Sequence, residues 1–495
     1  MSDNLRAKTI KALSWSFLQS AVARAIQFVI GIILARLLLP EQFGLIGMLM
    51  VFLAVARSFV ESGFGSALIQ KREATATDIC SVFYFNTFVG ILAAAFFCIT
   101  APCIATFFNQ PILTPLMRVL SVKIVIDSFG SVQYNLLIRE MDFRAHTIAS
   151  VVAGLLSGIV GISMAVAGFG VWSLAAQQIS ASAFSTLCFW VLRPWRPALT
   201  FSFGSLRTMF AFGSRLLFSG LLNQVFENIH SLVIGKLFSA ADLGLFTRAK
   251  ALQELPAQTV SEVVGKVTFP VFSKSQGDLE RLKKGAKKAL SAVAFVNFPL
   301  LVGISVSARP LVIVLLGEKW AGSIPYLQLL CGLGLLYPIY LIDLNLLMST
   351  GRSDLFLRLE IIKKALTVVS IIITYRWGIS AMICGMIALS LIACYFSIRY
   401  IQIVVDYRQG EQLRDLIPYF VMAALMGIAA SSVGLFGLSN HLMILFVQAL
   451  IAIFVYTTLC WIFKPTAFVE IRCELRDRIF YLRGKQPLIG LASKE

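Results

Sequence analysis

Residues 79–102 read ICSVFYFNTFVGILAAAFFCITAP, a run without one charged side chain. An α-helix rises 1.5 Å per residue, so roughly 20 apolar residues cross the hydrocarbon core of a bilayer. Comparable apolar runs recur along the whole chain. They predict an all-α polytopic membrane protein.

The composition supports this prediction. Of the 495 residues, 58% are hydrophobic and 14% charged, and the mean hydropathy is +0.83. Soluble domains contain roughly a quarter charged residues, so an ordinary soluble enzyme is excluded. A net charge of +18 would indicate nucleic-acid binding in a soluble chain. Here the basic residues gather in the loops between apolar runs, and no nucleic acid is expected as a partner.

The apolar runs and the polar breaks between them predict about fourteen transmembrane helices. Their expected limits are 12–38, 43–67, 79–102, 114–136, 146–168, 170–192, 207–237, 241–271, 286–308, 323–349, 355–375, 378–401, 416–437 and 441–463.

Positive charge is divided unevenly between the two sets of alternate loops. If the N-terminus faces the cytoplasm, the loops on that side hold most of the 43 Lys and Arg residues. The opposite loops hold only Arg36, Lys236, Arg309, Lys319 and Arg376. Because cytoplasmic loops are enriched in Lys and Arg, this bias predicts an even number of helices and two cytoplasmic termini.

The chain matches itself when it is shifted by 200 residues. Residues 35–38, ARLL, align with residues 235–238, GKLF, and Gly44 aligns with Gly244. The register holds without a gap across a loop and two helices, and both copies begin on the cytoplasmic side. This predicts a parallel duplication of six helices, an arrangement found in transporters whose site lies between two lobes.

We therefore expect four parts. They are an N-terminal lobe of helices 1–6 (residues 1–200), a C-terminal lobe of helices 7–12 (201–405), helices 13 and 14 (406–463) and a basic cytoplasmic tail (464–495). In the tail, apolar and basic residues from 471 to 483 alternate as in a helix that lies on an anionic membrane surface.

Several cations fall inside the expected helices, where a lipid-facing charge costs about 2.5–3.5 kcal/mol. Half of them have an acid one helical turn away, in the pairs Arg57–Glu61, Lys123–Asp127, Lys250–Glu254, Glu262–Lys266 and Glu360–Lys364. The cations without such a neighbour are Arg24, Arg118, Arg215, Arg248 and Lys363, against the unmatched acids Glu227 and Asp343. The expected helices thus hold an excess of positive charge.

The first helix of each lobe has a polar face. Arg24 shares one face of its helix with Ser16, Ser20, Gln27 and Gly31. The corresponding helix of the second lobe carries Arg215, Ser219, Asn223, Glu227 and His230, and the helix after it carries Arg248 and Lys250. Two such faces predict a water-filled cavity.

The depths of three arginines suggest what enters this cavity. Counted from the cytoplasmic face, Arg215, Arg24 and Arg248 lie progressively deeper in the membrane. This gradient suits an anionic head group that crosses the bilayer, since guanidinium groups bind phosphate oxygens through paired hydrogen bonds. A structural hydrogen bond between helices is the alternative for each arginine.

The candidate substrate-binding residues are therefore Arg24, Arg215, Arg248, Gln27, Asn223, Glu227, Arg57 and Lys250. His230 is either a packed core residue or a proton-coupling group. The three His lie far apart in sequence and the nine Cys form no CxxC pair, so neither a catalytic nor a metal-binding residue is expected.

Several motifs resemble one known family. The stretches that carry the resemblance are LARLLLPEQFG (34–44), GFGSALIQ (63–70), LGLFTRA (243–249), FPVF (269–272), LGEKW (316–320) and STGR (349–352). They are similar to the polysaccharide transporter family, the Wzx-type oligosaccharide flippases of the multidrug/oligosaccharidyl-lipid/polysaccharide exporter superfamily, and are closest to colanic-acid-exporter-like members. Phe246 departs from the pattern, because the family usually has Tyr there.

This resemblance implies two six-helix lobes around a central cavity, followed by two more helices. It implies a bacterial inner-membrane protein that flips an undecaprenyl-pyrophosphate-linked oligosaccharide to the outer leaflet by alternating access, for exopolysaccharide, capsule or O-antigen assembly. The implied partners are this lipid, the bilayer and other polysaccharide assembly proteins. No cofactor is implied, and coupling to Na⁺, H⁺ or the membrane potential is left open.

Three alternatives are weighed against this interpretation. A cation-coupled drug antiporter of the same superfamily should have unpaired carboxylates in its cavity, whereas here the cations outnumber the acids. A membrane-embedded polysaccharide polymerase or ligase should have a large outer loop with catalytic groups, and the chain has none. A peptidoglycan-precursor flippase shares the chemistry, but the motifs fit it less well.

Overall fold

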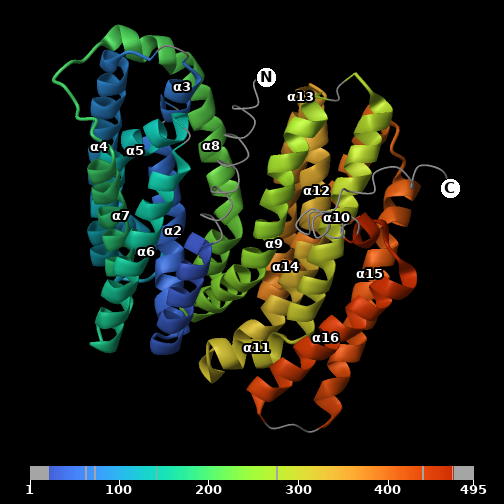
Figure 1. The fold of residues 1–495 in the computed structure, drawn as a ribbon. Coiled ribbons are helices and arrows are strands. Elements are labelled where there is room, and N and C mark those ends of the chain that lie inside the picture. Colours follow the sequence, from blue (N-terminus) through green and yellow to red (C-terminus); the bar gives the residue numbers. More distant parts are fainter. Residues whose placement is uncertain are drawn as a thin grey trace, which may run out of the picture. The chain divides into compact units, whose positions relative to one another are not determined.

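The computed structural model describes residues 22–61, 64–71, 74–140, 142–274, 277–436, 440–470 and 472. In these ranges the chain forms helices and the turns that join them, without a β-strand (Figure 1). The predicted all-α class is confirmed. The amphipathic segment expected in the tail lies outside the described residues, except for Arg472.

The chain divides into two compact units. Unit 1 comprises residues 1–248 together with 315–320, and unit 2 comprises residues 249–314 and 321–495. The division falls within one helix, directly after Arg248, and the short segment Leu315–Trp320 belongs to unit 1 although its flanking residues belong to unit 2. The lobe boundary expected at residue 200 refers to the sequence repeat and stays a prediction.

Unit 1 is built from antiparallel helices joined by short connections (Figure 1). They are a helix over residues 22–37, α2 (Pro40–Glu61), α3 (Phe64–Gln70), α4 (Ala76–Phe108), α5 (Leu113–Arg139), α6 (Phe143–Val166), α7 (Val171–Leu192), α8 (Phe203–Leu237) and the first part of α9 (Ala240–Lys274).

Unit 2 holds the rest of α9 and the helices that follow it. They are α10 (Leu279–Val306), α11 (Ala308–Leu315), the 3₁₀ helix η1 (Glu318–Ser323), α12 (Ile324–Ser349), α13 (Ser353–Thr374), η2 (Tyr375–Trp377), α14 (Ile379–Val405), α15 (Gln409–Ser431), η3 (Ser432–Phe436) and α16 (His441–Phe463). The last residue of α11 and the start of η1 lie in the segment of unit 1.

Each of the fourteen expected segments overlaps helical structure in the described residues; positions 12–21 of the first segment lie outside them. Eight helices in that part of the chain are long and apolar enough to cross a membrane, namely α2, α4, α6, α10, α12, α14, α15 and α16. The protein is thus a polytopic membrane protein, while the count of fourteen spans is not confirmed. Among the other long helices, α5 and α8 carry charges, and α7 carries two adjacent glutamines.

Each unit has its own apolar core. In unit 1, buried side chains of α3, α4, α5 and α8 form one cluster around Leu68, Val82 and Val132. In unit 2 a larger cluster joins α10, α12, α14 and α15 around Leu290, Leu346 and Ala423. Burial of these apolar groups fixes the helices that carry the polar side chains described below.

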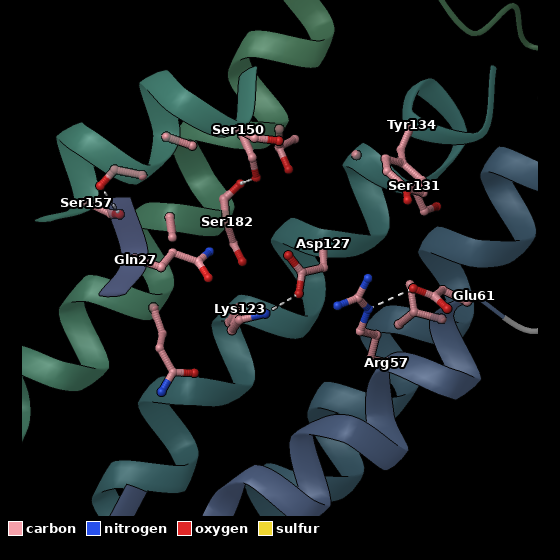
Figure 2. A pocket seen from close by; sticks show the side chains of 18 of the residues that line it. Gln27, Arg57, Glu61, Lys123, Asp127, Ser131, Tyr134, Ser150, Ser157 and Ser182 are labelled. Carbon is pink, nitrogen blue, oxygen red and sulfur yellow. Dashed lines mark hydrogen bonds and ion pairs between the residues drawn. The ribbon is translucent and has the colours of Figure 1, made fainter. Parts of the chain in front are cut away.

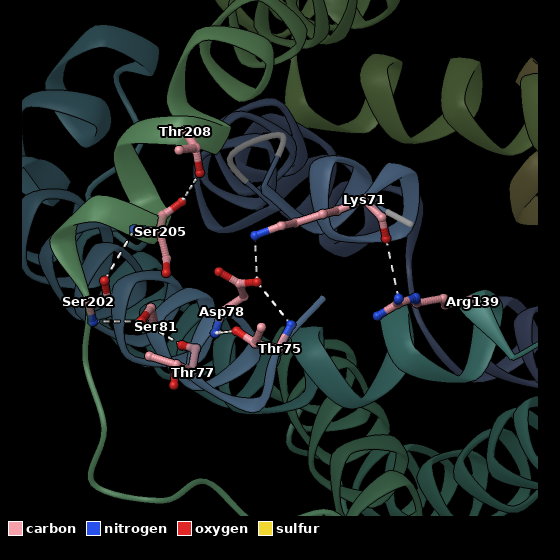
Figure 3. A network of polar contacts seen from close by, with 9 residues as sticks. All are labelled: Lys71, Thr75, Thr77, Asp78, Ser81, Arg139, Ser202, Ser205 and Thr208. Carbon is pink, nitrogen blue, oxygen red and sulfur yellow. Dashed lines mark hydrogen bonds and ion pairs between the residues drawn. The ribbon is translucent and has the colours of Figure 1, made fainter. Parts of the chain in front are cut away.

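A polar network fastens the ends of four helices in unit 1 (Figure 3). Thr75 caps α4, and its own N–H donates to the Asp78 carboxylate (2.9 Å) in a capping box. Lys71, just after α3, pairs with the same buried carboxylate at 2.6 Å. Arg139, at the end of α5, donates to the Lys71 carbonyl, and the Ser202 N–H before α8 donates to Ser81. The network sets where these helices begin and end.

A second bond of this kind joins the ends of α5 and α7. Arg193 donates to both carboxylate oxygens of Glu140. This hydrogen bonding holds the pKa of the Glu140 carboxyl below its usual value. The bond therefore ties the C-terminal ends of α5 and α7 together.

The two copies of the repeat meet at a pair of glycines. A Cβ on Gly44 of α2 would overlap the carbonyl of Ala240, and a Cβ on Gly244 of α9 would overlap the carbonyl of Pro40. Pro40 and Ala240 are themselves equivalent under the shift of 200 residues, so the contact is reciprocal. Reciprocal contacts arise where equivalent elements meet about a two-fold axis. The packing of α2 against α9 in unit 1 thus supports the register of the repeat.

Candidate functional site

A cavity of about 1090 Å³ lies within unit 1. It is lined by the helix over residues 22–37 and by α2, α3, α5, α6, α7, α8 and the start of α9 (Figure 2). Cavities that bind small ligands typically measure roughly 300–1,000 Å³, so this one is large enough for a sizeable ligand.

A row of alternating charges crosses one wall of the cavity. On α2, Arg57 pairs with Glu61 at 2.7 Å, and on α5 Lys123 pairs with Asp127 at 2.5 Å. Figure 2 shows the Arg57 guanidinium between the carboxylates of Asp127 and Glu61. The order Lys123, Asp127, Arg57, Glu61 therefore alternates in sign, and the four charges cancel.

Arg248 adds a further positive charge to the cavity lining. Its guanidinium carbon lies 4.1 Å from the centre of the Phe43 ring, in cation–π geometry. In the described part of the chain no carboxylate lies within ion-pair distance of this side chain, and its buried Nε donates no hydrogen bond. Among the described residues, the charged side chains that line the cavity thus sum to +1, which Arg248 supplies.

The opposite wall is polar but uncharged. It carries Gln27, Ser150, Ser157 and Ser182 (Figure 2), and the lining also includes the amides Gln177 and Gln178 and the hydroxyl groups of Ser185 and Thr186. The hydroxyls of Ser150 and Ser157 donate to backbone carbonyls of their own helix, which leaves their oxygens as acceptors. Such a wall can accept from hydroxyl groups of a ligand, and the amides can also donate to them.

The structure brings three of the predicted site residues together. Gln27, Arg57 and Arg248 line the cavity, from three different helices. The expected pairing of Arg57 with Glu61 is confirmed, and so are the pairs Lys123–Asp127, Lys250–Glu254 and Glu360–Lys364. The side chains of Glu262 and Lys266 lie outside the described part of the structure.

The other predicted site residues lie elsewhere. Arg24 is half-buried one turn before Gln27, interacts with other groups of the protein and is absent from the lining. Arg215, Asn223 and Glu227 of α8 are exposed, and α8 contributes Leu217 and Gly220 to the cavity instead. Lys250 belongs to unit 2 and pairs with Glu254 at 3.6 Å. Their roles in binding stay predictions.

Several lining residues did not enter the predicted site. Lys123, Asp127 and Glu61 were visible in the sequence only as members of neutralising pairs. The hydroxyl and amide groups of α6 and α7 gave one usable signal, the adjacent Gln177 and Gln178 in an otherwise apolar run. In the described residues, no group of three or more His, Cys, Asp or Glu side chains could hold a metal ion.

Comparison with known proteins identifies the family. A family profile described as polysaccharide biosynthesis protein matches residues 33–325. The lipopolysaccharide biosynthesis protein WzxC of Escherichia coli (strain K12) is 30% identical over 376 residues, which cover 75% of this chain and 76% of that protein. The succinoglycan biosynthesis transport protein ExoT of Rhizobium meliloti (strain 1021) is 27% identical over 67% of each chain.

Two solved structures share the fold. The lipid II flippase MurJ, in an inward closed conformation, superposes with a TM-score of 0.74 at 14% identity, over 90% of this chain and 98% of that one. An inward-facing multidrug resistance MATE transporter of the MOP superfamily superposes with a TM-score of 0.63 at 16% identity, over 78% of this chain and 96% of that one.

The resemblance inferred from the motifs is confirmed, since the matched region includes LARLLLPEQFG and LGEKW. The fold is the one found in these two solved structures, as expected. With a matching profile over more than half of its length, the chain belongs to the polysaccharide biosynthesis protein family.

Proposed function

We propose that the protein is a flippase that moves an undecaprenyl-pyrophosphate-linked oligosaccharide from the cytoplasmic to the outer leaflet of a bacterial inner membrane. The observation that carries this proposal is Arg248, a half-buried cation on the wall of the cavity with a buried Nε and no acidic partner among the described residues. A guanidinium in this setting suits an oxyanion with two acceptor atoms on one side, as in a pyrophosphate.

The two walls of the cavity suit the two polar parts of such a substrate. The charged wall and Arg248 face the pyrophosphate, and the hydroxyl and amide wall faces the sugars. Sugar hydroxyls both donate and accept, and the serine oxygens and glutamine amides offer the complementary groups. The relatives support the class of substrate, because their names refer to lipopolysaccharide and succinoglycan biosynthesis and to flipping of lipid II.

The proposed activity is transport rather than bond chemistry. The substrate cannot cross the hydrocarbon unaided because its charges and hydroxyls would lose their hydration. A cavity that replaces this hydration, opened first to one leaflet and then to the other, lowers the barrier without a catalytic residue. We propose that a Na⁺ or H⁺ gradient or the membrane potential drives the cycle in one direction.

The cavity disfavours the drug-antiporter alternative. An organic cation would be attracted by a net negative cavity, whereas the charged side chains in the described part of this lining sum to +1.

The test measures binding and transport in the same variants. Purified protein should bind undecaprenyl pyrophosphate and not undecaprenol, which lacks the charge. Hydrogen bonds to charged groups contribute about 1.5–3 kcal/mol, so Arg248→Ala should weaken binding roughly 10- to 100-fold. In cells, the same variant should accumulate lipid-linked oligosaccharide and reduce surface polysaccharide.

Arg376→Ala is the matched control, because Arg376 is exposed and contacts Tyr375 next to it. It should behave as wild type in both measurements. Equal binding of the two lipids, or full transport by well-inserted Arg248→Ala protein, would contradict the proposal.

A further inference from the structure

The segment Leu315–Trp320 packs against the C-terminal end of the helix over residues 22–37, the first described helix of unit 1. Trp320 is fully buried, and its indole Nε1 donates to the carbonyl of Ala35 at 2.8 Å. Lys319 donates to the carbonyl of Arg36 at 2.8 Å, and Arg36 in turn donates to the carbonyl of Leu315 at 2.9 Å. The last carbonyls of a helix have no partner within the helix, so the segment supplies the missing donors.

The buried indole also contacts the ring that carries Arg248. The ring centres of Trp320 and Phe43 are 5.4 Å apart, with an interplanar angle of 73°, an edge-to-face contact. Phe43 is itself buried. The contacts therefore form a chain from Trp320 through Phe43 to the guanidinium of Arg248 in the cavity lining.

The position of the Arg248 guanidinium depends on the Phe43 ring because few other groups interact with it. In the described residues its positive charge faces no acid, and its Nε has no acceptor. Gly31 leaves the room that the guanidinium occupies, since a Cβ there would lie 3.1 Å from one of the terminal nitrogens. An acid in place of the aromatic face would hold the guanidinium firmly but would neutralise it.

We propose that Trp320 is a positioning residue for the anion-binding site: it fixes Phe43, and Phe43 fixes Arg248 with its charge available to the substrate. This inference rests on the proposed function, because it takes Arg248 as the group that binds the pyrophosphate. The inference also assigns one role to two motifs about 280 residues apart, LARLLLPEQFG and LGEKW, which are in contact here.

The test uses undecaprenyl pyrophosphate as the probe, with Trp320→Leu and Trp320→Phe. Without Trp320, Phe43 is no longer fixed and its cation–π contact with Arg248 weakens. Binding of the probe should therefore weaken roughly 3- to 10-fold in Trp320→Leu, and less in Trp320→Phe, which keeps an aromatic edge against Phe43. Thermal unfolding of the detergent-purified variants reports whether each protein is folded. If Trp320→Leu does not fold, Trp320→Phe takes its place in the test.

Trp190→Leu and Trp190→Phe are the matched controls. The Trp190 indole also donates to a backbone carbonyl in unit 1, that of Phe129 at 3.0 Å, but its ring lies against Phe83 and Arg196. These variants remove the same kind of hydrogen bond without touching Phe43 or Arg248. They should leave binding of the probe unchanged.

A double-mutant cycle with Arg248→Gln separates positioning from a general structural role. Residues that act through one another give non-additive effects, so Trp320→Leu should have almost no further effect on binding in the Arg248→Gln protein. Additive effects, or a Trp320→Leu protein that binds like its Trp190 control, would overturn the inference and leave the proposed function intact. Unchanged binding by Arg248→Gln alone would instead remove the proposed site.

Discussion

At the scale of single residues, the alternating row of charges tunes the cavity. Asp127 lies between Lys123 and Arg57, so its carboxylate lowers the positive potential that both cations present (Figure 2). Asp127→Asn raises the net charge of the lining from +1 to +2. We expect this variant to bind undecaprenyl pyrophosphate roughly 3- to 10-fold more tightly at low salt and to lose much of that gain at high salt.

Glu280→Gln provides the control for this prediction. Glu280 also pairs with a lysine one turn away, Lys284 at 2.8 Å, but both side chains of this pair are highly exposed. Its neutralisation should leave binding unchanged at every salt concentration. If Asp127→Asn behaves in the same way in a binding titration, the row of charges has no influence on the ligand.

At the scale of helices, the packing of α2 against α9 depends on two glycines. Gly44 and Gly244 each face a backbone carbonyl of the other helix, and a methyl group would overlap it. Because backbone cannot move aside as a side chain can, we expect Gly44→Ala and Gly244→Ala each to destabilise the protein by about 1–3 kcal/mol. Thermal unfolding of purified protein measures the effect.

Gly204→Ala is the comparison for these two variants. Gly204 lies in the first turn of α8, where a Cβ would meet only the Ser202 hydroxyl at an ordinary 3.6 Å. Alanine is the better helix former, so this variant should be neutral or more stable by up to about 1 kcal/mol. Similar melting temperatures for all three variants would refute the close contact between the helices.

For the whole molecule, the sequence predicted the helices far better than their arrangement. Apolar runs locate the helices because membrane insertion depends on local hydrophobicity, and i,i+4 pairs such as Arg57–Glu61 are local too. Which polar face lines the cavity depends on how the helices rotate against one another. Sequence patterns therefore favour Arg248 and the exposed Arg215 equally, and they do not predict that Trp320 contacts a helix about 280 residues earlier.

The arrangement of unit 2 leads to a prediction about membrane topology. Three ion pairs connect the start of α10 with the start of α15 and with the chain just after α16: Lys283–Glu411, Lys287–Asp415 and Lys288–Glu470. These three ends must therefore lie on one side of the membrane. They are rich in Lys and Arg, so we predict that they face the cytoplasm and that the C-terminus is cytoplasmic too.

Two reporter fusions test this orientation. A fusion to the C-terminus should give fluorescent GFP and inactive alkaline phosphatase, because phosphatase folds only outside the cytoplasm. A fusion directly after Gly378, between α13 and α14, should give the opposite pair of signals, since a single helix, α14, separates that point from the start of α15. Active phosphatase at the C-terminus would reverse the orientation. Equal signals at the two points would mean that α14 does not cross the membrane, against its length and hydropathy.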